Sequence, residues 1–321
     1  MPRVVAILVA IALPVIVGLF FLRQTSEGSY EYDPNRAVYH TFSGDLAFEH
    51  LTKLVGFGPR PSGSNNLEAS RQYLEQVLTA AGWATERQIF DQDTPIGNVT
   101  FVNVRARFLG RRNASKLWET PASVLVGSHY DTKKYSEFEF VGANDSGSST
   151  AALLEIGRVT AKRPDVAHKL ELVFFDGEEA FNPNIDANDG LYGSRYYGKR
   201  LRRLAPKEKP KFGIVLDMIG DKQLNIGVPA DSPPQLYRWM MQAAKDLSFE
   251  SYFGKHDTAI LDDHLPLNQS GVPSIDIIDL DYGTWHTKND TMKHVSAESI
   301  SIVSKTTLLL IEKYALVNAK G

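Results

Sequence analysis

Hydrophobic residues in the first third of the chain follow two different spacings. Spacings of three and four residues over Asp45–Val55 and Leu67–Ala81 predict two amphipathic helices, and Gly82 is a typical stop signal for the second. Over Asn98–Phe108 apolar residues alternate with polar ones, which predicts a strand at the edge of a sheet or in a mixed sheet.

Short apolar runs alternate with longer helical segments in the rest of the chain. Strand, loop and helix in repeated succession are typical of a sheet that is covered by helices. We therefore expect the α/β class, with a mixed, mostly parallel central sheet flanked by helices on both faces. The strands are predicted at Val124–Val126, Leu170–Phe175, Ile214–Leu216 and Ser274–Ile278, and the helices at Ser149–Val159, Pro234–Leu247 and Ala297–Val317.

The N-terminus carries an uninterrupted apolar stretch. Val4–Leu22 contains no charged residue and is long enough to cross a hydrocarbon core of ~30 Å. The residues before Arg23 make a poor cleavage site, which favours an uncleaved membrane anchor over a signal sequence. Such an anchor usually exports the domain attached to it, so we expect this domain in the periplasm, a lumen or the exterior. The expected division is an anchor or signal sequence over 1–23, a polar linker over 24–41 and one catalytic domain over 42–321.

Composition narrows the kind of site. The chain is 43% hydrophobic and has a formal net charge of -3 with scattered basic residues, so no nucleic-acid partner is expected. It contains no cysteine, which excludes thiolate ligands. Any metal must therefore be held by histidine, aspartate and glutamate.

Carboxylates and histidines come directly after the predicted strands. Ligands of open α/β sheets bind at the carboxyl ends of the strands, so these positions are the first candidates for a site. Each residue alone is more often a cap or a turn former, but together they make a ligand set for a cation such as zinc. The set comprises His129, Asp145, Glu179, Asp217 and His286.

The order of these motifs resembles that of zinc aminopeptidases, which bind two metals through a bridging aspartate. The resemblance runs from about Leu51 to the C-terminus and includes the pair Glu178-Glu179. It implies that Glu178 is the general base. It further implies a bridging Asp145, one zinc with Glu179 and His286, and a second zinc with His129 and Asp217.

A narrower resemblance is to the glutaminyl-peptide cyclotransferases, which share this fold and typically bind one zinc. It rests on the segments 174–181, 191–195, 262–266 and 285–287. It implies a single zinc held by Asp145, Glu179 and His286, and peptide substrates whose N-terminal glutamine is cyclised to pyroglutamate with release of ammonia. Under this hypothesis Glu178 transfers the proton, with Asp217 and Asp262 as its carboxylate neighbours, and Trp285 is a wall of the substrate pocket.

Several alternatives stay open at this stage. The chain departs from animal cyclotransferases at Asn184, where they have tryptophan, and at Leu261, where they have glutamine. An aminopeptidase with two zincs would use Glu178 to activate water, and the acidic run at 276, 279 and 281 could attract a free amino terminus. Trp285 could instead be a core aromatic, and Asp263 and His264 are expected to be structural. A catalytically inactive binding module is disfavoured because the base and all the ligands are present.

Overall fold

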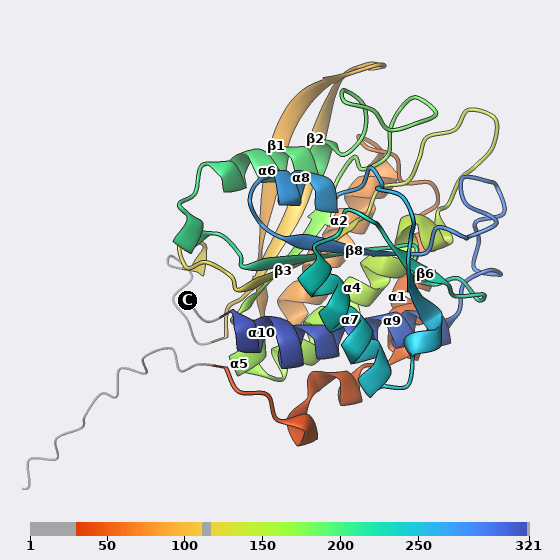
Figure 1. The fold of residues 1–321 in the computed structure, drawn as a ribbon. Helices are drawn as coiled ribbons and strands as arrows, with labels where there is room; N and C mark the ends of the chain where they lie inside the picture. Colours follow the sequence, from red (N-terminus) through yellow and green to blue (C-terminus); the bar gives the residue numbers. More distant parts are fainter. Residues whose placement is uncertain (1–29, 111–116, 320–321) are drawn as a thin grey trace, which may run out of the picture.

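A six-stranded mixed sheet runs through the centre of the protein (Figure 1). The computed structural model describes residues 30–110 and 117–319. The strand order is β1-β2-β4-β3-β5-β8, in which β4, β3, β5 and β8 are parallel and β2 pairs antiparallel with both β1 and β4. The strands are β1 (Trp83–Thr94), β2 (Gly97–Phe108), β3 (Val124–His129), β4 (Leu170–Phe175), β5 (Phe212–Asp217) and β8 (Ser274–Ile278), and a separate small sheet pairs β6 (Ile226–Val228) with β7 (Phe253–Lys255).

Helices cover both faces of the sheet, as expected for this class (Figure 1). On one face α2, α4 and α7 contact the strands and α1 and α9 pack over α4, while α6 and α8 cover the other face. The first group comprises α1 (Gly44–Val55), α2 (Asn65–Ala80), α4 (Ser149–Ala161), α7 (Pro234–Asp246) and α9 (Ala297–Leu309), the second α6 (Tyr192–Arg202) and α8 (His264–Gln269), and the short helices are α5 (Pro164–Ala167) and α10 (Leu316–Asn318).

The central strands are apolar without alternation because both of their faces are buried. In β3, Val124 and Val126 join the larger hydrophobic cluster, whereas Leu125 joins the cluster beneath α6 and α8. Each fully buried side chain of this size stabilises the fold by about 1.5–3 kcal/mol. The two clusters hold the strand ends at fixed positions, and the candidate site lies at those ends.

The predicted strands and helices are all present, but several elements have no clear signal in the sequence, among them β1 and α6. β1 is an edge strand rich in charged residues, and it buries mainly Trp83 and Gln88. Helix α6 contains Gly198, whose Cα lies close to the backbone of α8. A Cβ at this position would be 2.8 Å from the carbonyl oxygen of Pro266. In α6 tertiary packing overrides a weak helix propensity.

Residues 30–41, at the end of the expected linker, pack onto the domain. They include the turns η1 (Pro34–Arg36) and η2 (Val38–Thr41), and the buried Glu312 accepts hydrogen bonds from the Tyr30 hydroxyl (3.0 Å) and the Val38 backbone N–H (2.7 Å). The expected anchor lies outside the described residues, and within them no helix is both long and apolar enough to cross a membrane. The division into anchor, linker and domain stays a prediction.

Candidate metal centre

The predicted ligands converge at the carboxyl edge of the parallel strands. His129 is the last residue of β3 and Asp217 the last of β5. Glu179 lies in the turn after β4, Asp145 lies in the helical turn η3 (Ala143–Ser148) that leads into α4, and His286 lies in the loop after β8. Residues from five separate connections therefore meet at one point, as expected where parallel strands end together.

Asp145 lies between the two histidines. Its Oδ2 atom is 3.3 Å from Nε2 of His286, and its Oδ1 atom is 3.2 Å from Nε2 of His129. The Nε2 atom of His286 also lies 3.2 Å from Oε1 of Glu179. The ligand atoms of Asp145, Glu179 and His286 all lie within 4.8 Å of one another, which is close enough for one cation.

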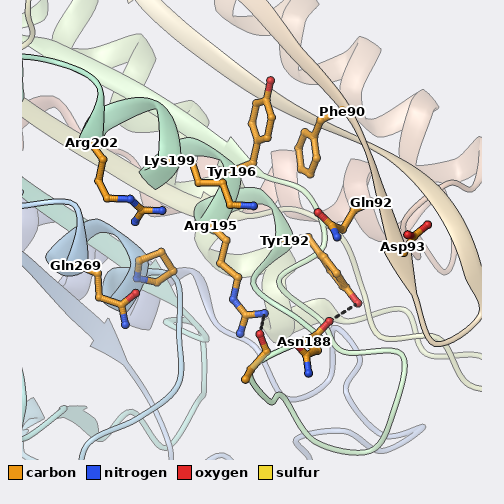
Figure 2. Close-up of a pocket in the computed structure, with 12 residues that line it drawn as sticks. Phe90, Gln92, Asp93, Asn188, Tyr192, Arg195, Tyr196, Lys199, Arg202 and Gln269 are labelled. Carbon is orange, nitrogen blue, oxygen red and sulfur yellow. Dashed lines mark hydrogen bonds between the residues drawn. The ribbon is translucent and has the colours of Figure 1, made fainter.

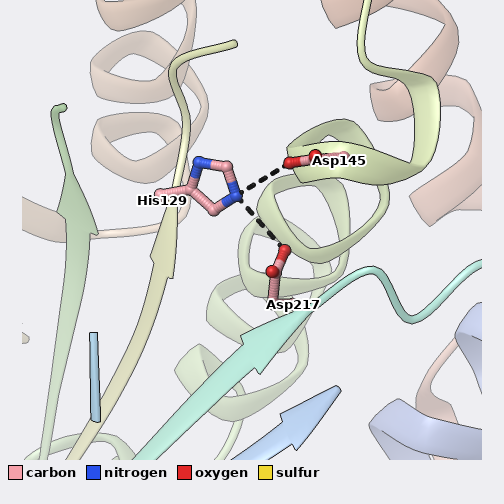
Figure 3. A group of neighbouring side chains, drawn as sticks. All are labelled: His129, Asp145 and Asp217. Carbon is pink, nitrogen blue, oxygen red and sulfur yellow. Dashed lines mark hydrogen bonds and ion pairs between the residues drawn. The ribbon is translucent and has the colours of Figure 1, made fainter. Parts of the chain in front are cut away.

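A second group shares Asp145 (Figure 3). His129 points its Nε2 atom at both Asp145 and Asp217, and the distance to Oδ1 of Asp217 is 3.2 Å. These three side chains are buried and also have ligand atoms within 4.8 Å of one another. The structure thus brings together all five predicted ligands, in the two sets that the aminopeptidase resemblance implied.

The loop before Asp145 is shaped by backbone contacts. Gly142 has a φ of 52°, and a Cβ at this position would lie 2.0 Å from the Asp145 carbonyl oxygen, so only glycine fits. Asp290 accepts the backbone N–H of Asn144 at 2.8 Å and that of Asp145 at 3.1 Å. These contacts fix where the Asp145 carboxylate points.

The Glu178-Glu179 pair is positioned in a similar way. Gly177 before it has a φ of 71°, and a Cβ there would lie 2.4 Å from the ring of Phe101. Asp131 then accepts the backbone N–H groups of Glu178 (3.2 Å) and Glu179 (3.4 Å), one on each carboxylate oxygen. The turn after β4 therefore presents two consecutive glutamates in fixed positions.

Burial and mutual repulsion raise the pKa of most of these carboxyl groups. Burial raises the pKa of Glu178 well above its usual range, and the charges of Glu179 and Asp262 raise it further. Burial and the charge of Asp217 raise the pKa of Asp262 to about 6. Asp145 is the exception, because burial alone would raise its pKa but hydrogen bonds from both histidines hold that pKa below the usual range.

The residues present fit a divalent cation. Burial opposes protonation of His286, yet hydrogen bonds to Asp145 and Glu179 raise its pKa to about 9. The proton on His286 therefore offsets part of the negative charge at this site. Several carboxylates face one another there without an equal number of cationic side chains. The donors are oxygen and imidazole nitrogen without sulfur, which is a set that zinc accepts.

A pocket of about 230 Å³ opens above the centre. Asp145, Glu178, Glu179, Asp217 and His286 line its floor, while His129 lies behind it. Its walls include Asn184, Leu261, Trp285 and the alternate residues Ile278 and Leu280. Trp285 is 51% exposed and stacks on the His286 ring with centroids 4.0 Å apart, so it is a pocket residue and not a core aromatic.

The acidic run at 276, 279 and 281 does not line this pocket. Among the described residues Asp276 is buried beneath the site, and Asp279 accepts the backbone N–H of Asn225 at 2.9 Å. Strand alternation explains the positions of Asp279 and Asp281, because Ile278 and Leu280 face the pocket and their neighbours do not. Asp276 is on the same side as Ile278 but is fully buried and does not line the pocket. The expectation that these aspartates attract an amino terminus is therefore not supported by their positions.

Other acidic and basic residues around the centre were not singled out from the sequence. Asp131 and Asp290 orient the ligand loops, and the buried Lys133 lies with its Nζ atom 3.5 Å from Glu179 and donates to the Ala180 carbonyl at 2.8 Å. In the sequence, Asp131 was marked only by its position two residues after His129. Behind Asp262, the buried His264 lies 3.5 Å from Asp276, and its expected structural role stays a prediction.

Comparison with known proteins places this geometry in a family. Residues 103–311, more than half of the chain, match the peptidase family M28. The chain belongs to peptidase family M28. This assignment confirms the resemblance to zinc aminopeptidase-like proteins that the motifs indicated.

Several relatives of this M28 chain are described as glutaminyl cyclases. The glutaminyl-peptide cyclotransferase of Dictyostelium discoideum is 26% identical over 296 residues, which cover 80% of this chain and 81% of the relative. The solved structure of an Acidobacteriales bacterium glutaminyl cyclase is 32% identical, with a TM-score of 0.76 over 87% of this chain and 96% of that one. A Zn-dependent exopeptidase from Parabacteroides distasonis is 26% identical, with a TM-score of 0.73 over 84% and 98% of the two chains.

Proposed function

We propose that this chain is a glutaminyl-peptide cyclotransferase, which converts the N-terminal glutamine of peptides to pyroglutamate and releases ammonia. The observation that carries the proposal is the similarity to glutaminyl cyclases along almost the whole chain. In addition, Glu178 lies beside a complete ligand set at the floor of a small pocket. The pocket is of a size that takes one side chain and its amino terminus.

One zinc ion, held by Asp145, Glu179 and His286, is the expected cofactor. Access to the pocket favours this ligand set over the set that contains His129. All three members of the favoured set line the pocket, whereas His129 is buried behind it. A catalytic zinc keeps one position open for substrate. When bound there, zinc would polarise the side-chain amide carbonyl of the substrate and favour negative charge on its oxygen.

Glu178 is the group that moves the proton. Its carboxylate takes a proton from the α-amine as the amine nitrogen bonds to the side-chain amide carbon, and it returns a proton to the departing nitrogen, which leaves as ammonia. The carbon–nitrogen bond of the side-chain amide breaks, the ring closes, and no net proton is gained or lost. The raised pKa of Glu178 suits a group that must both accept and return a proton.

Two aspartates set the charge around this base. Asp217 and Asp262 line the same pocket as Glu178, and the charge of Asp262 is one of the causes of its raised pKa. Their own pKa values are raised by burial and by neighbouring carboxylates, which favours a shared proton among the three groups. We assign them to this proton-sharing network.

The walls of the pocket select the substrate side chain. Trp285 offers an apolar face next to the ligand His286, and Leu261 extends that face. Asn184 and Leu261 stand where animal cyclotransferases have tryptophan and glutamine, so the entrance is shaped differently here. We assign Trp285 to substrate binding, in contact with the methylene groups of the glutamine.

A zinc aminopeptidase is the second candidate function. His129, Asp145 and Asp217 form a complete second ligand group, and the similarity to a Zn-dependent exopeptidase covers most of the chain. In that reaction a water molecule, deprotonated by Glu178, attacks the first peptide bond. Two tightly bound zinc ions per chain would favour this function over cyclisation.

Paired peptides distinguish the two functions. The full-length chain, purified in detergent with its metal, is incubated with one peptide that begins with glutamine and another that begins with leucine. A cyclotransferase releases ammonia from the first peptide only, and leaves the second intact. Release of free leucine or of free glutamine would instead identify an aminopeptidase.

The location of the enzyme depends on the expected anchor. An uncleaved span over Val4–Leu22 would hold the domain at the membrane, with the catalytic centre in the periplasm, a lumen or the exterior. Protease treatment of intact cells or sealed vesicles tests this proposal. With protease on the extracytoplasmic side of the membrane, digestion of the domain supports the proposal. Digestion only when the protease has access to the cytoplasmic side contradicts it.

A further inference from the structure

A second hollow lies beside the catalytic pocket, and the reaction above makes no use of it. Its volume is about 460 Å³, and it lies between one face of α6 and the distal end of β1 (Figure 2). The residue Gln269 at the end of α8 and the loop residues Ala187 and Asn188 complete its lining. We call this hollow the α6 pocket.

Three cations of α6 line the α6 pocket. Arg195, Lys199 and Arg202 are spaced four and three residues apart, so they share one face of the helix. Figure 2 shows them in a row along one side of the hollow. Among the described residues, the only carboxylate in the lining is Asp93, which already accepts a hydrogen bond from Asn98 at 3.0 Å.

These cations are available to a ligand. Within the described residues Lys199 and Arg202 make no hydrogen bond or ion pair, and both side chains are exposed. Arg195 is held in place because its two terminal nitrogens donate to the carbonyls of Ala187 (3.0 Å) and Asp186, which leaves the remaining N–H groups of its guanidinium free. Like charges one turn apart repel one another, so an anion between them relieves a cost that the free protein bears.

An aromatic pair, Tyr196 of α6 and Phe90 of β1, also lines the α6 pocket beside the cations (Figure 2). The rings of Phe90 and Tyr196 stack with centroids 4.1 Å apart and an angle of 3° between their planes. Tyr196 is 37% exposed. The hollow therefore combines cations with an apolar, rigid surface, which suits a peptide segment better than a bare inorganic ion.

One loop connects the α6 pocket to the catalytic pocket. Ile185 lines the catalytic pocket and Ala187, two positions later, lines the α6 pocket, so their Cα atoms are at most about 7 Å apart. The loop is fixed from within, since Asp189 accepts the backbone N–H groups of Phe181 (2.9 Å) and Asn182 (2.8 Å). A chain that leaves the catalytic pocket across this loop would enter the α6 pocket within a few residues.

We propose that the α6 pocket binds acidic side chains of the peptide substrate, downstream of the glutamine that is cyclised. This inference rests on the proposed function, because the N-terminal glutamine in the catalytic pocket sets the direction in which the peptide runs. The peptide must cross the loop between the two pockets. The acidic residues that reach the α6 pocket are therefore expected at about positions four to eight, counted from the N-terminal glutamine. The enzyme would then prefer peptides that carry aspartate or glutamate there over neutral and basic ones.

Three peptides that begin with the same four residues, including an N-terminal glutamine, test the proposal. They end in three glutamates, three glutamines or three lysines. The full-length enzyme is expected to cyclise the acidic peptide with about threefold to tenfold higher kcat/KM than the neutral one, mainly through a lower KM, because the contact is remote from the reacting atoms. Equal kcat/KM for the three peptides would overturn the proposal.

Charge reversal on α6 sharpens the test. In the double variant Lys199→Glu, Arg202→Glu the preference should shift to the lysine-tailed peptide. The matched control Lys162→Glu, Lys245→Glu reverses two exposed cations at the ends of other helices and should keep the preference for the acidic peptide. An unchanged preference in the α6 variant, or the same loss in the control, contradicts the proposal.

A binding measurement separates this proposal from the proposed function. If no glutamine peptide is cyclised, the cyclotransferase assignment fails, but the α6 pocket can still be tested with a fluorescent acidic peptide that already begins with pyroglutamate. Anisotropy should show weaker binding to the α6 double variant than to the wild type and the control. Equal binding by all three proteins would overturn the site.

Discussion

The Oδ2 atom of Asp145 lies 3.3 Å from the Nε2 atom of His286. The two residues are far apart in the sequence, and the parallel strands of the sheet bring them together. Asp290 fixes the backbone of Asp145, and Glu179 provides a second carboxylate for the histidine. The site is thus pre-formed by the fold, and its properties can be tested residue by residue.

Glu178 and Glu179 are neighbours with different assigned roles. Glu178→Gln removes the proton carrier and should lower kcat by about 100-fold to 10,000-fold while zinc remains bound. Glu179→Gln removes a proposed ligand and should lower zinc content in parallel with activity. Activity and zinc content of both variants, measured by ammonia release and metal analysis, check this assignment. Loss of zinc in Glu178→Gln with retention in Glu179→Gln would reverse the two roles.

Asp290 should act on zinc affinity without touching the ion. Asp290→Asn replaces one of the two oxygens that each accept a backbone N–H with an NH2 group, so the Asp145 carboxylate is less well placed and zinc affinity should fall by about tenfold to 100-fold. Asp279→Asn is the matched control, because Asp279 is also buried and also accepts backbone N–H groups, but away from the centre. Competition with a chromophoric chelator measures both affinities, and equal losses would show only a general effect on the fold.

Zinc binding should release a proton at neutral pH. The pKa of His286 is raised to about 9 in the metal-free protein, so its imidazole is protonated at pH 7, and it must lose that proton to bind a metal. The apparent affinity should therefore rise as pH increases from about 6 to about 9. Calorimetric titration of the metal-free protein in buffers of different ionisation enthalpy counts the proton. Binding without proton release, and with the same affinity across this range, would contradict the assignment of His286.

Trp285 should affect substrate binding more than stability. Half of its surface is exposed, and it stacks on His286 at the pocket, so Trp285→Ala should raise KM about tenfold and leave the melting temperature almost unchanged. Trp239→Ala is a useful contrast, since the partly buried Trp239 packs edge-on against Phe212 at the margin of the core, and its loss should lower the melting temperature instead. A large loss of stability in Trp285→Ala would mean that the residue is structural.

The sequence predicted the central sheet and the ligand set because both leave local signals. Buried parallel strands such as β4 are continuous apolar runs, and ligands such as His129 lie directly at the ends of such runs. The edge strand β1 and helix α6 left no such signal, because one is half exposed and the other depends on close backbone contacts of its glycines.

The supporting residues of the site could not be predicted, because they act through contacts that are distant in sequence. Asp290 reaches the backbone of Asp145 across the sheet, and Lys133 reaches the carbonyl of Ala180. The side of the sheet on which Asp276 lies was also not predictable, since a shift of one residue in strand register exchanges it with its apolar neighbours. These features depend on register and packing, which a single sequence does not contain.

Mass spectrometry of one glutamine peptide in ¹⁸O-labelled water is the most direct test of the proposed reaction. The zinc-loaded enzyme should yield a product lighter by one ammonia and free of ¹⁸O, and a chelator should abolish its formation until zinc is restored. A peptide shortened by one residue, together with free glutamine carrying ¹⁸O in its carboxylate, would show hydrolysis and contradict the account.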